Sequence, residues 1–177
     1  MSTYKMYFAG SGGQGILLMG QIVGSAAILE EKEATFFPSY GPEMRGGTAN
    51  CTVIVSDMGI SSPLISESDY VVAMTLPSML KFEPTLKPGG MLFLNKSIIH
   101  QAPKRSDITV IDVPVTELAN ELGNPRVANV IMLGAFVRNT DCVATESVEQ
   151  VIRDIFGTKK AELVDLEIKA YNYWRKE

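Results

Sequence analysis

The sequence has few of the residues that carry metal or redox chemistry. It contains two cysteines, Cys51 and Cys142, and a single histidine, His100. The cysteines lack the C-x-x-C spacing of metal sites, and iron–sulfur clusters are held by sets of cysteine thiolates. We therefore expect no metal site and no cluster on this chain. A lone histidine in a predicted loop is more often a surface residue than a catalyst.

Catalytic motifs and concentrated charge are also missing. The chain has no G-x-S-x-G turn, no Walker A loop and no Gly-Asp-Gly start of a thiamine-diphosphate metal site. Its net charge is −4, and its basic residues form no run beyond Lys104-Arg105 and Lys159-Lys160. This composition argues against a nucleic-acid binder, which needs a concentrated cationic face. We expect no catalytic residue here, which favours a subunit completing a site built mainly by others.

The length of 177 residues predicts one domain, 1–177, and an apolar content of 46% indicates a globular protein. The longest apolar runs are too short to cross a bilayer. Glycines break the first apolar stretch, so no signal peptide is predicted. We expect a soluble cytoplasmic protein without membrane contact.

The chain is organised around a glycine-rich segment, Gly10-Ser11-Gly12-Gly13-Gln14-Gly15. The residues before it, Tyr4–Ala9, are typical of a strand, and Ile16–Leu29 after it are typical of a helix. The glycines have the G-x-G-x-x-G spacing. Glycine permits a tight turn and lets an anion approach the N–H groups of a helix N-terminus.

Two interpretations of this segment stay open, a tight strand-to-helix turn and a site for a phosphate-bearing ligand. An independent NAD site is disfavoured, because such a site places an acidic residue at the end of the second strand. Here the predicted second strand, Ala34–Phe37, runs into Pro38 instead.

A second candidate segment, Ser39–Thr48, follows that strand. It combines the turn formers Gly41-Pro42 and Gly46-Gly47 with Tyr40, Glu43 and Arg45. Loops at the carboxyl ends of strands carry sites in open α/β sheets. Arg45 and Glu43 form either a contact to a phosphate or a partner, or a solvated surface ion pair. If both segments follow adjacent strands, they lie side by side at one edge of the sheet.

The remaining pattern predicts an α/β protein. Thr48–Val55 alternates between apolar and polar residues, which indicates a strand, with an antiparallel neighbour as one arrangement. Further strands are predicted at Asp69–Met74, Met91–Leu94 and Thr109–Val113, a turn at 87–90, and helices at Pro77–Glu83, Thr116–Leu122, Ala128–Val137, 145–156 and Ala161–Arg175. The expected fold is a Rossmann-like three-layer sandwich with a mainly parallel sheet and helices on both faces.

Three parts of the sequence carry a family resemblance: the segment 10–15, the segment 38–50, and the apolar helix near Asn129 and Gly134. On these residues the chain resembles the gamma subunit of the 2-oxoacid:ferredoxin oxidoreductases over nearly its whole length. Around Tyr40 to Asn50 it is most similar to gamma subunits of 2-oxoglutarate or broad 2-oxoacid enzymes. The related subunit of the indolepyruvate enzyme is a weaker match.

The resemblance implies the overall reaction, a coenzyme A-dependent oxidative decarboxylation of a 2-oxoacid that reduces ferredoxin. It implies thiamine diphosphate, Mg and Fe–S clusters on partners, namely thiamine-binding alpha and beta subunits and a ferredoxin-like delta subunit. The gamma chain then contacts these subunits or the coenzyme A path.

Site residues follow from the loops and the resemblance together. The residues expected to bind a phosphate-bearing cofactor, with coenzyme A as the co-substrate, are Gly10, Gly12, Gly13, Gln14, Gly15 and Arg45. Those expected at the subunit interface are Tyr40, Glu43, Arg45, Gly46 and Asn50. A free-standing nucleotide-binding protein and a purely structural scaffold subunit are the alternatives.

Overall fold

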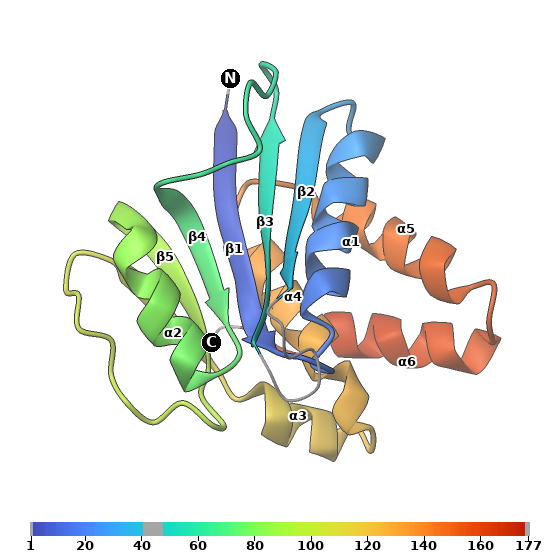
Figure 1. The fold of residues 1–177 in the computed structure, drawn as a ribbon. Coiled ribbons are helices and arrows are strands. Elements are labelled where there is room, and N and C mark those ends of the chain that lie inside the picture. Colours follow the sequence, from blue (N-terminus) through green and yellow to red (C-terminus); the bar gives the residue numbers. More distant parts are fainter. Residues whose placement is uncertain (1, 41–47, 176–177) are drawn as a thin grey trace.

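The fold is built on one mixed β-sheet, seen in a computed structural model that describes residues 2–40 and 48–175 (Figure 1). Within these residues the strands are β1 (Thr3–Ser11), β2 (Glu33–Tyr40), β3 (Thr48–Ser56), β4 (Ser68–Ala73), β5 (Leu86–Asn95) and β6 (Thr109–Val113). Their spatial order is β2-β3-β1-β4-β5-β6. Strand β3 is antiparallel to both β1 and β2, and the other pairs are parallel. Every strand except β3 thus points the same way, as the predicted mainly parallel sheet requires.

Helices cover both faces of the sheet, which confirms the three-layer prediction. The helices are α1 (Ile16–Leu29), α2 (Leu76–Phe82), α3 (Val115–Glu121), α4 (Ala128–Arg138), α5 (Thr145–Phe156) and α6 (Ala161–Tyr171), with short 3-10 turns at Glu83–Thr85 and Pro125–Val127. The helices α1, α4, α5 and α6 share one apolar core with the sheet, whereas α2 closes a smaller core on the opposite face.

The larger core explains why α1 and α4 are apolar around most of their surfaces. Helix α1 packs on the sheet and also on α5, so it is buried on two sides. Phe136 of α4 makes edge-to-face contacts with Phe8, Phe93 and Tyr70 of the sheet, at centroid separations of 5.3–5.6 Å. Such aromatic contacts fix the position of α4 over the centre of the sheet.

Several details differ from the sequence predictions. Strand β2 does not end at Phe37 but continues through Pro38 to Tyr40, because these residues pair with β3. Residues 87–90 were expected to form a turn, but they lie inside β5 as an irregularity, where the pairing with β4 shifts between Ser68 and Tyr70. Gly89 there has a φ of +79°, which explains why a turn-like composition fits within a strand. The last helix ends at Tyr171 rather than Arg175.

Candidate functional site

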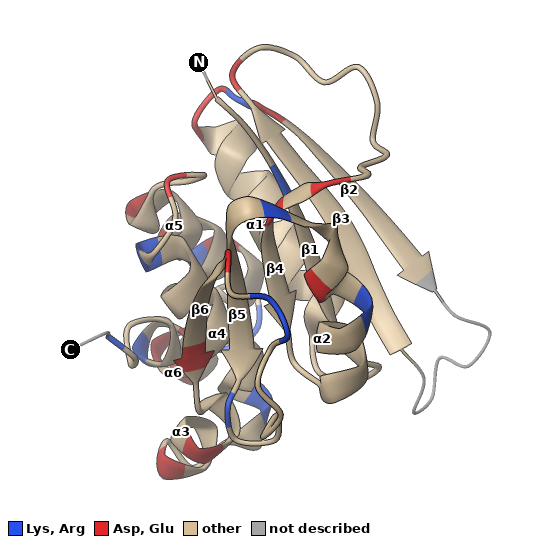
Figure 2. Ribbon diagram, turned by 90° about the vertical axis from the view of Figure 1, so that its left-hand side faces the viewer, with Lys and Arg blue, Asp and Glu red and all other residues tan. Residues whose placement is uncertain are grey.

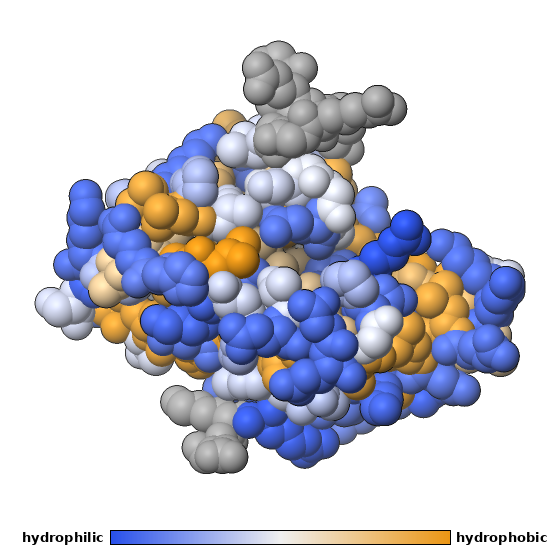
Figure 3. Space-filling model, turned by 90° about the horizontal axis from the view of Figure 1, so that it is seen from below, coloured by the Kyte–Doolittle hydropathy of each residue, from blue (hydrophilic) through white to orange (hydrophobic). Residues whose placement is uncertain are grey.

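The glycine-rich segment lies at the carboxyl end of β1 and leads directly into α1. Gly13 and Gly15 have φ angles of +86° and +70°, a left-handed conformation that glycine adopts without strain. The tight strand-to-helix turn is therefore present. Figure 3 looks at this end of the molecule, where apolar side chains gather toward the two sides and polar ones lie between them.

Gln14 closes the glycine-rich segment on itself. Its Oε1 accepts a hydrogen bond of 2.7 Å from the backbone N–H of Ser11. A Cβ atom on Gly10 would lie 2.5 Å from the same Oε1, so the glycine makes room for the glutamine side chain. Gln14 thus has a structural use for its carbonyl, and its Nε2 has no hydrogen-bond partner among the described residues.

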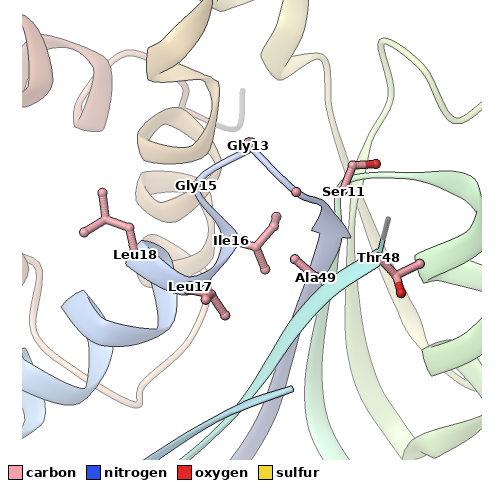
Figure 4. A pocket seen from close by; sticks show the side chains of 9 residues that line it. Ser11, Gly13, Gly15, Ile16, Leu17, Leu18, Thr48 and Ala49 are labelled. Carbon is pink, nitrogen blue, oxygen red and sulfur yellow. The ribbon is translucent and has the colours of Figure 1, made fainter. Parts of the chain in front are cut away.

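The first of two cavities beside the segment lies toward β3. We call it the β3-side cavity; it has a volume of about 410 Å³ and is lined mainly by backbone and apolar side chains. Figure 4 shows Ile16 and Leu17 of α1 across from Ala49 of β3. Its lining residues are Ser11, Gly12, Gly13, Gly15, Ile16, Leu17, Leu18, Thr48 and Ala49.

The second cavity lies on the other side of the segment, and we call it the switch-point cavity. Its volume is about 270 Å³, and its lining residues are Gly13, Gln14, Met74, Asn95, Thr116, Pro125, Arg126, Ala128 and Asn129. Helices α1 and α2 leave the neighbouring strands β1 and β4 for opposite faces of the sheet. Open α/β sheets bind ligands at such a change of winding direction.

Polar side chains line the switch-point cavity at the ends of several elements. Asn95, the last residue of β5, donates from Nδ2 to the hydroxyl of Thr116 at 3.1 Å. Asn129 in the first turn of α4 donates from Nδ2 to the carbonyl of Gly15 at 3.3 Å. The sequence analysis did not identify Asn95, Thr116 or Asn129 as site residues. Asn95 following the apolar run 91–94, and Asn129 opening an apolar helix, were the available signals.

The predicted site residues divide between the two cavities. Gly12, Gly13 and Gly15 line the β3-side cavity, and Gly13 and Gln14 line the switch-point cavity. Asn50 is nearly buried within β3, where it pairs in register with Ala9 and Ser39. Tyr40 ends β2, whereas Glu43, Arg45 and Gly46 lie outside the described residues.

The two candidate segments were expected to lie side by side because they follow adjacent strands, and this reason is wrong. They do not follow adjacent strands, because β3 lies between β1 and β2. The first residues of β3 pair with the last residues of both strands, Thr48 with Ser11 and Ala49 with Tyr40. The ends of β1 and β2 therefore lie at the same end of the sheet, one strand apart.

The charges and thiols of the described chain add little reactivity. Figure 2 shows residues of both signs interspersed on the side that it presents. Burial raises the pKa of Cys51 to about 12 and that of Cys142 to about 11, so both remain protonated thiols at neutral pH. Residues 2–40 and 48–175 contain no group of three or more candidate metal ligands. None of the helices described there is long and apolar enough to cross a membrane.

Comparison with known proteins identifies the family of this chain. The model of the family "Pyruvate ferredoxin/flavodoxin oxidoreductase" matches residues 5–174. The 2-oxoglutarate synthase subunit KorC of Methanocaldococcus jannaschii is 37% identical over 165 residues, covering 90% of this chain and 88% of that one. The ketoisovalerate oxidoreductase subunit VorA of Methanothermobacter marburgensis is 34% identical, covering 93% of this chain but 34% of its own length.

A solved structure agrees with these relatives. The gamma subunit of a keto/oxoacid ferredoxin oxidoreductase from Geobacter sulfurreducens superposes with a TM-score of 0.84 at 31% identity, covering 97% of this chain and 93% of that one. The chain belongs to the pyruvate ferredoxin/flavodoxin oxidoreductase family, as a gamma subunit of the 2-oxoacid:ferredoxin oxidoreductases.

Proposed function

We propose that this gamma subunit serves a cytoplasmic complex that oxidises 2-oxoglutarate with coenzyme A. In that reaction the 2-oxoacid loses carbon dioxide, the acyl group forms a thioester with coenzyme A, and the two electrons released reduce ferredoxin. The choice of 2-oxoglutarate is supported by the 37% identity to a 2-oxoglutarate synthase subunit, although a ketoisovalerate oxidoreductase subunit is nearly as similar at 34%.

The chemistry of carbon–carbon cleavage and electron transfer belongs to partner subunits in this proposal. Thiamine diphosphate with Mg is held by the alpha and beta subunits, and Fe–S clusters are held by a ferredoxin-like delta subunit. The contribution of this chain is contact with coenzyme A and with those subunits.

The observation that carries the proposal is the glycine-rich segment between two cavities. Its backbone leads into the N-terminus of α1, where N–H groups and the helix dipole favour phosphate oxygens. Gly12 and Gly13 carry no side chain that would keep a ligand from this backbone. These residues hold and orient the ligand, and we assign none of them to the reacting atoms.

Arg45 is proposed to add a charged contact to the same ligand. A guanidinium binds phosphate oxygens in a bidentate fork, which a lysine does not reproduce. Tyr40, Glu43, Gly46 and Asn50 are proposed as contacts to the partner subunits. Asn50 lies on β3 at the same end of the sheet as the last residues of β1 and β2.

The test uses the complex assembled from this chain and its partner subunits. Arg45→Ala is expected to weaken coenzyme A or subunit binding by about 2–5 kcal/mol, and Arg45→Lys to recover part of that loss. The readouts are assembly by size exclusion and the KM for coenzyme A in ferredoxin reduction.

Arg153→Ala provides a matched control. Arg153 forms an exposed ion pair with Glu149 on α5, at 2.9 Å, so its loss is expected to cost at most about 1 kcal/mol and to leave the KM unchanged. If Arg45→Ala, Arg45→Lys and wild type prove indistinguishable, Arg45 is an ordinary surface residue and its proposed role is wrong.

A further inference from the structure

Asn129 and Gly15 fit together as a pair. Asn129 is 5% exposed, and its Nδ2 donates a hydrogen bond to the Gly15 carbonyl at 3.3 Å. A Cβ atom on Gly15 would collide with the Asn129 amide, and Gly15 also has the positive φ noted above. The first turn of α4 thus holds the point where the glycine-rich segment becomes α1.

The amide oxygen of Asn129, Oδ1, is available to accept a hydrogen bond. Among the described residues its Oδ1 has no hydrogen-bond partner. In the described residues, two side-chain polar atoms are both fully buried and without a hydrogen-bond partner, the hydroxyl of Thr35 and Oε2 of Glu167. Oδ1 of Asn129 is not one of them, so this oxygen is accessible from the surface of the core. Asn129 lines the switch-point cavity, and an amide oxygen so placed favours a hydrogen-bond donor.

The rest of the switch-point cavity supplies donors. Thr116 accepts from Asn95, which leaves its own hydroxyl hydrogen to donate. Gln14 has an unused Nε2, and Arg126 at the rim is exposed and forms no ion pair among the described residues. A ligand that suits this cavity carries an anionic group next to a hydroxyl or amide N–H.

We propose that Asn129 is a positioning residue for coenzyme A. It fixes the Gly15 carbonyl, and with it the orientation of the glycine-rich segment, and its Oδ1 accepts a hydrogen bond from a hydroxyl or amide N–H of the ligand. The inference rests on the proposed function, because coenzyme A combines phosphates with such donors. Asn129 acts through the loop and the bound ligand, away from the bond that forms.

The substitution Asn129→Asp distinguishes the role of the amide N–H, which donates to Gly15, from that of the amide oxygen, which is proposed to accept from the ligand. The side chain keeps its shape and an acceptor for the ligand, but an ionised carboxylate cannot donate to the Gly15 carbonyl and repels it. When the carboxyl is protonated, its O–H restores the donor. Burial raises the pKa of a carboxyl, so the protonated form becomes populated at mildly acidic pH.

The experiment measures the KM for coenzyme A and kcat in the assembled complex between pH 5.5 and 8. For Asn129→Asp we expect a KM about tenfold above wild type at pH 8, the effect of one lost hydrogen bond, with kcat nearly unchanged. The ratio of the two KM values is expected to fall toward one as the pH is lowered. Asn120→Asp on α3, an exposed position, introduces the same charge and is expected to match wild type throughout.

Three outcomes contradict different parts of the account. A wild-type complex without coenzyme A-dependent ferredoxin reduction overturns the proposed function. An active wild type with an Asn129→Asp variant that has the same KM at every pH overturns the positioning role. A KM that stays equally high in Asn129→Asp and Asn129→Ala at every pH also overturns it, because the donor to Gly15 is then irrelevant.

A second pair covers the case in which Asn129→Asp does not assemble. Asn129→Ser keeps a hydroxyl that can donate, and Asn129→Ala does not. We expect the serine variant to have a KM at least about threefold lower than the alanine variant. Equal KM values in this pair contradict the proposal.

Discussion

Replacing Gly134 with alanine tests how closely α4 and α6 approach one another. In the interior of a helix, alanine is favoured over glycine by about 1 kcal/mol. At Gly134, however, the new Cβ would collide with the backbone carbonyl of Tyr171 at the end of α6, and would lie 3.0 Å from its carbonyl carbon. Because backbone atoms cannot rotate aside, the two helices have to move apart.

The expected loss combines two terms. Overpacking of a core costs about 1–3 kcal/mol. Moving α6 also strains the hydrogen bonds that Arg138 donates to the Tyr171 carbonyl, at 2.6 Å, and to Oδ1 of Asn172, at 2.7 Å. Hydrogen bonds of charged groups contribute about 1.5–3 kcal/mol each, and a displacement of α6 would lose part of that contribution. After the gain in helix propensity, we expect a net loss of about 2 kcal/mol in the free energy of unfolding.

Gly24→Ala is the matched control, because Gly24 lies inside α1 and a Cβ there would meet nothing within 4 Å. This variant is expected to gain about 0.5–1 kcal/mol. Urea unfolding of both variants, followed by circular dichroism, gives the comparison. If Gly134→Ala is as stable as Gly24→Ala, the close approach of α4 and α6 is wrong.

Two further predictions concern buried titratable groups. Burial raises the pKa of Glu167 from 4.5 to about 7. The Glu167 carboxyl therefore loses its proton at a lower pH in the unfolded chain than in the folded one. The folded state consequently loses stability relative to the unfolded state as the pH rises from 4.5 to about 7. Glu167→Gln should therefore gain stability relative to wild type from pH 4.5 to 8 in urea titrations, and a constant difference contradicts this. Cys51 and Cys142 are buried with raised pKa values, so a thiol reagent at pH 8 should label neither in the native chain and both after denaturation. Rapid native labelling would show that the core opens there.

The elements of the larger core were predictable because burial leaves a clear pattern. The structure places α1 at Ile16–Leu29, as predicted, since a glycine precedes it and its apolar residues continue to the end. The alternation of Thr48–Val55 likewise identified β3, which runs one residue further. Local sequence is sufficient where one face, or nearly every face, of an element is buried.

The order of the strands was not predictable in the same way. The insertion of β3 between β1 and β2 depends on which strand edges pair, and the alternation within β3 does not report its edges. Both faces of β3 are largely buried, since the consecutive residues Val53, Ile54 and Val55 are all at most 2% exposed. The contact of Asn129 was not predictable for a related reason. It contacts Gly15, which is 114 positions away in the chain, and a polar residue at the start of a helix does not reveal its distant partner.

Our central proposal is that this gamma subunit contacts coenzyme A and is required for the coenzyme A-dependent oxidation of a 2-oxoacid. The most direct measurement is ferredoxin reduction by the partner subunits, with and without this chain, in the presence of 2-oxoglutarate and coenzyme A. We expect activity and acyl-CoA formation to require the chain. Full coenzyme A-dependent activity from the partner subunits alone would contradict the claim.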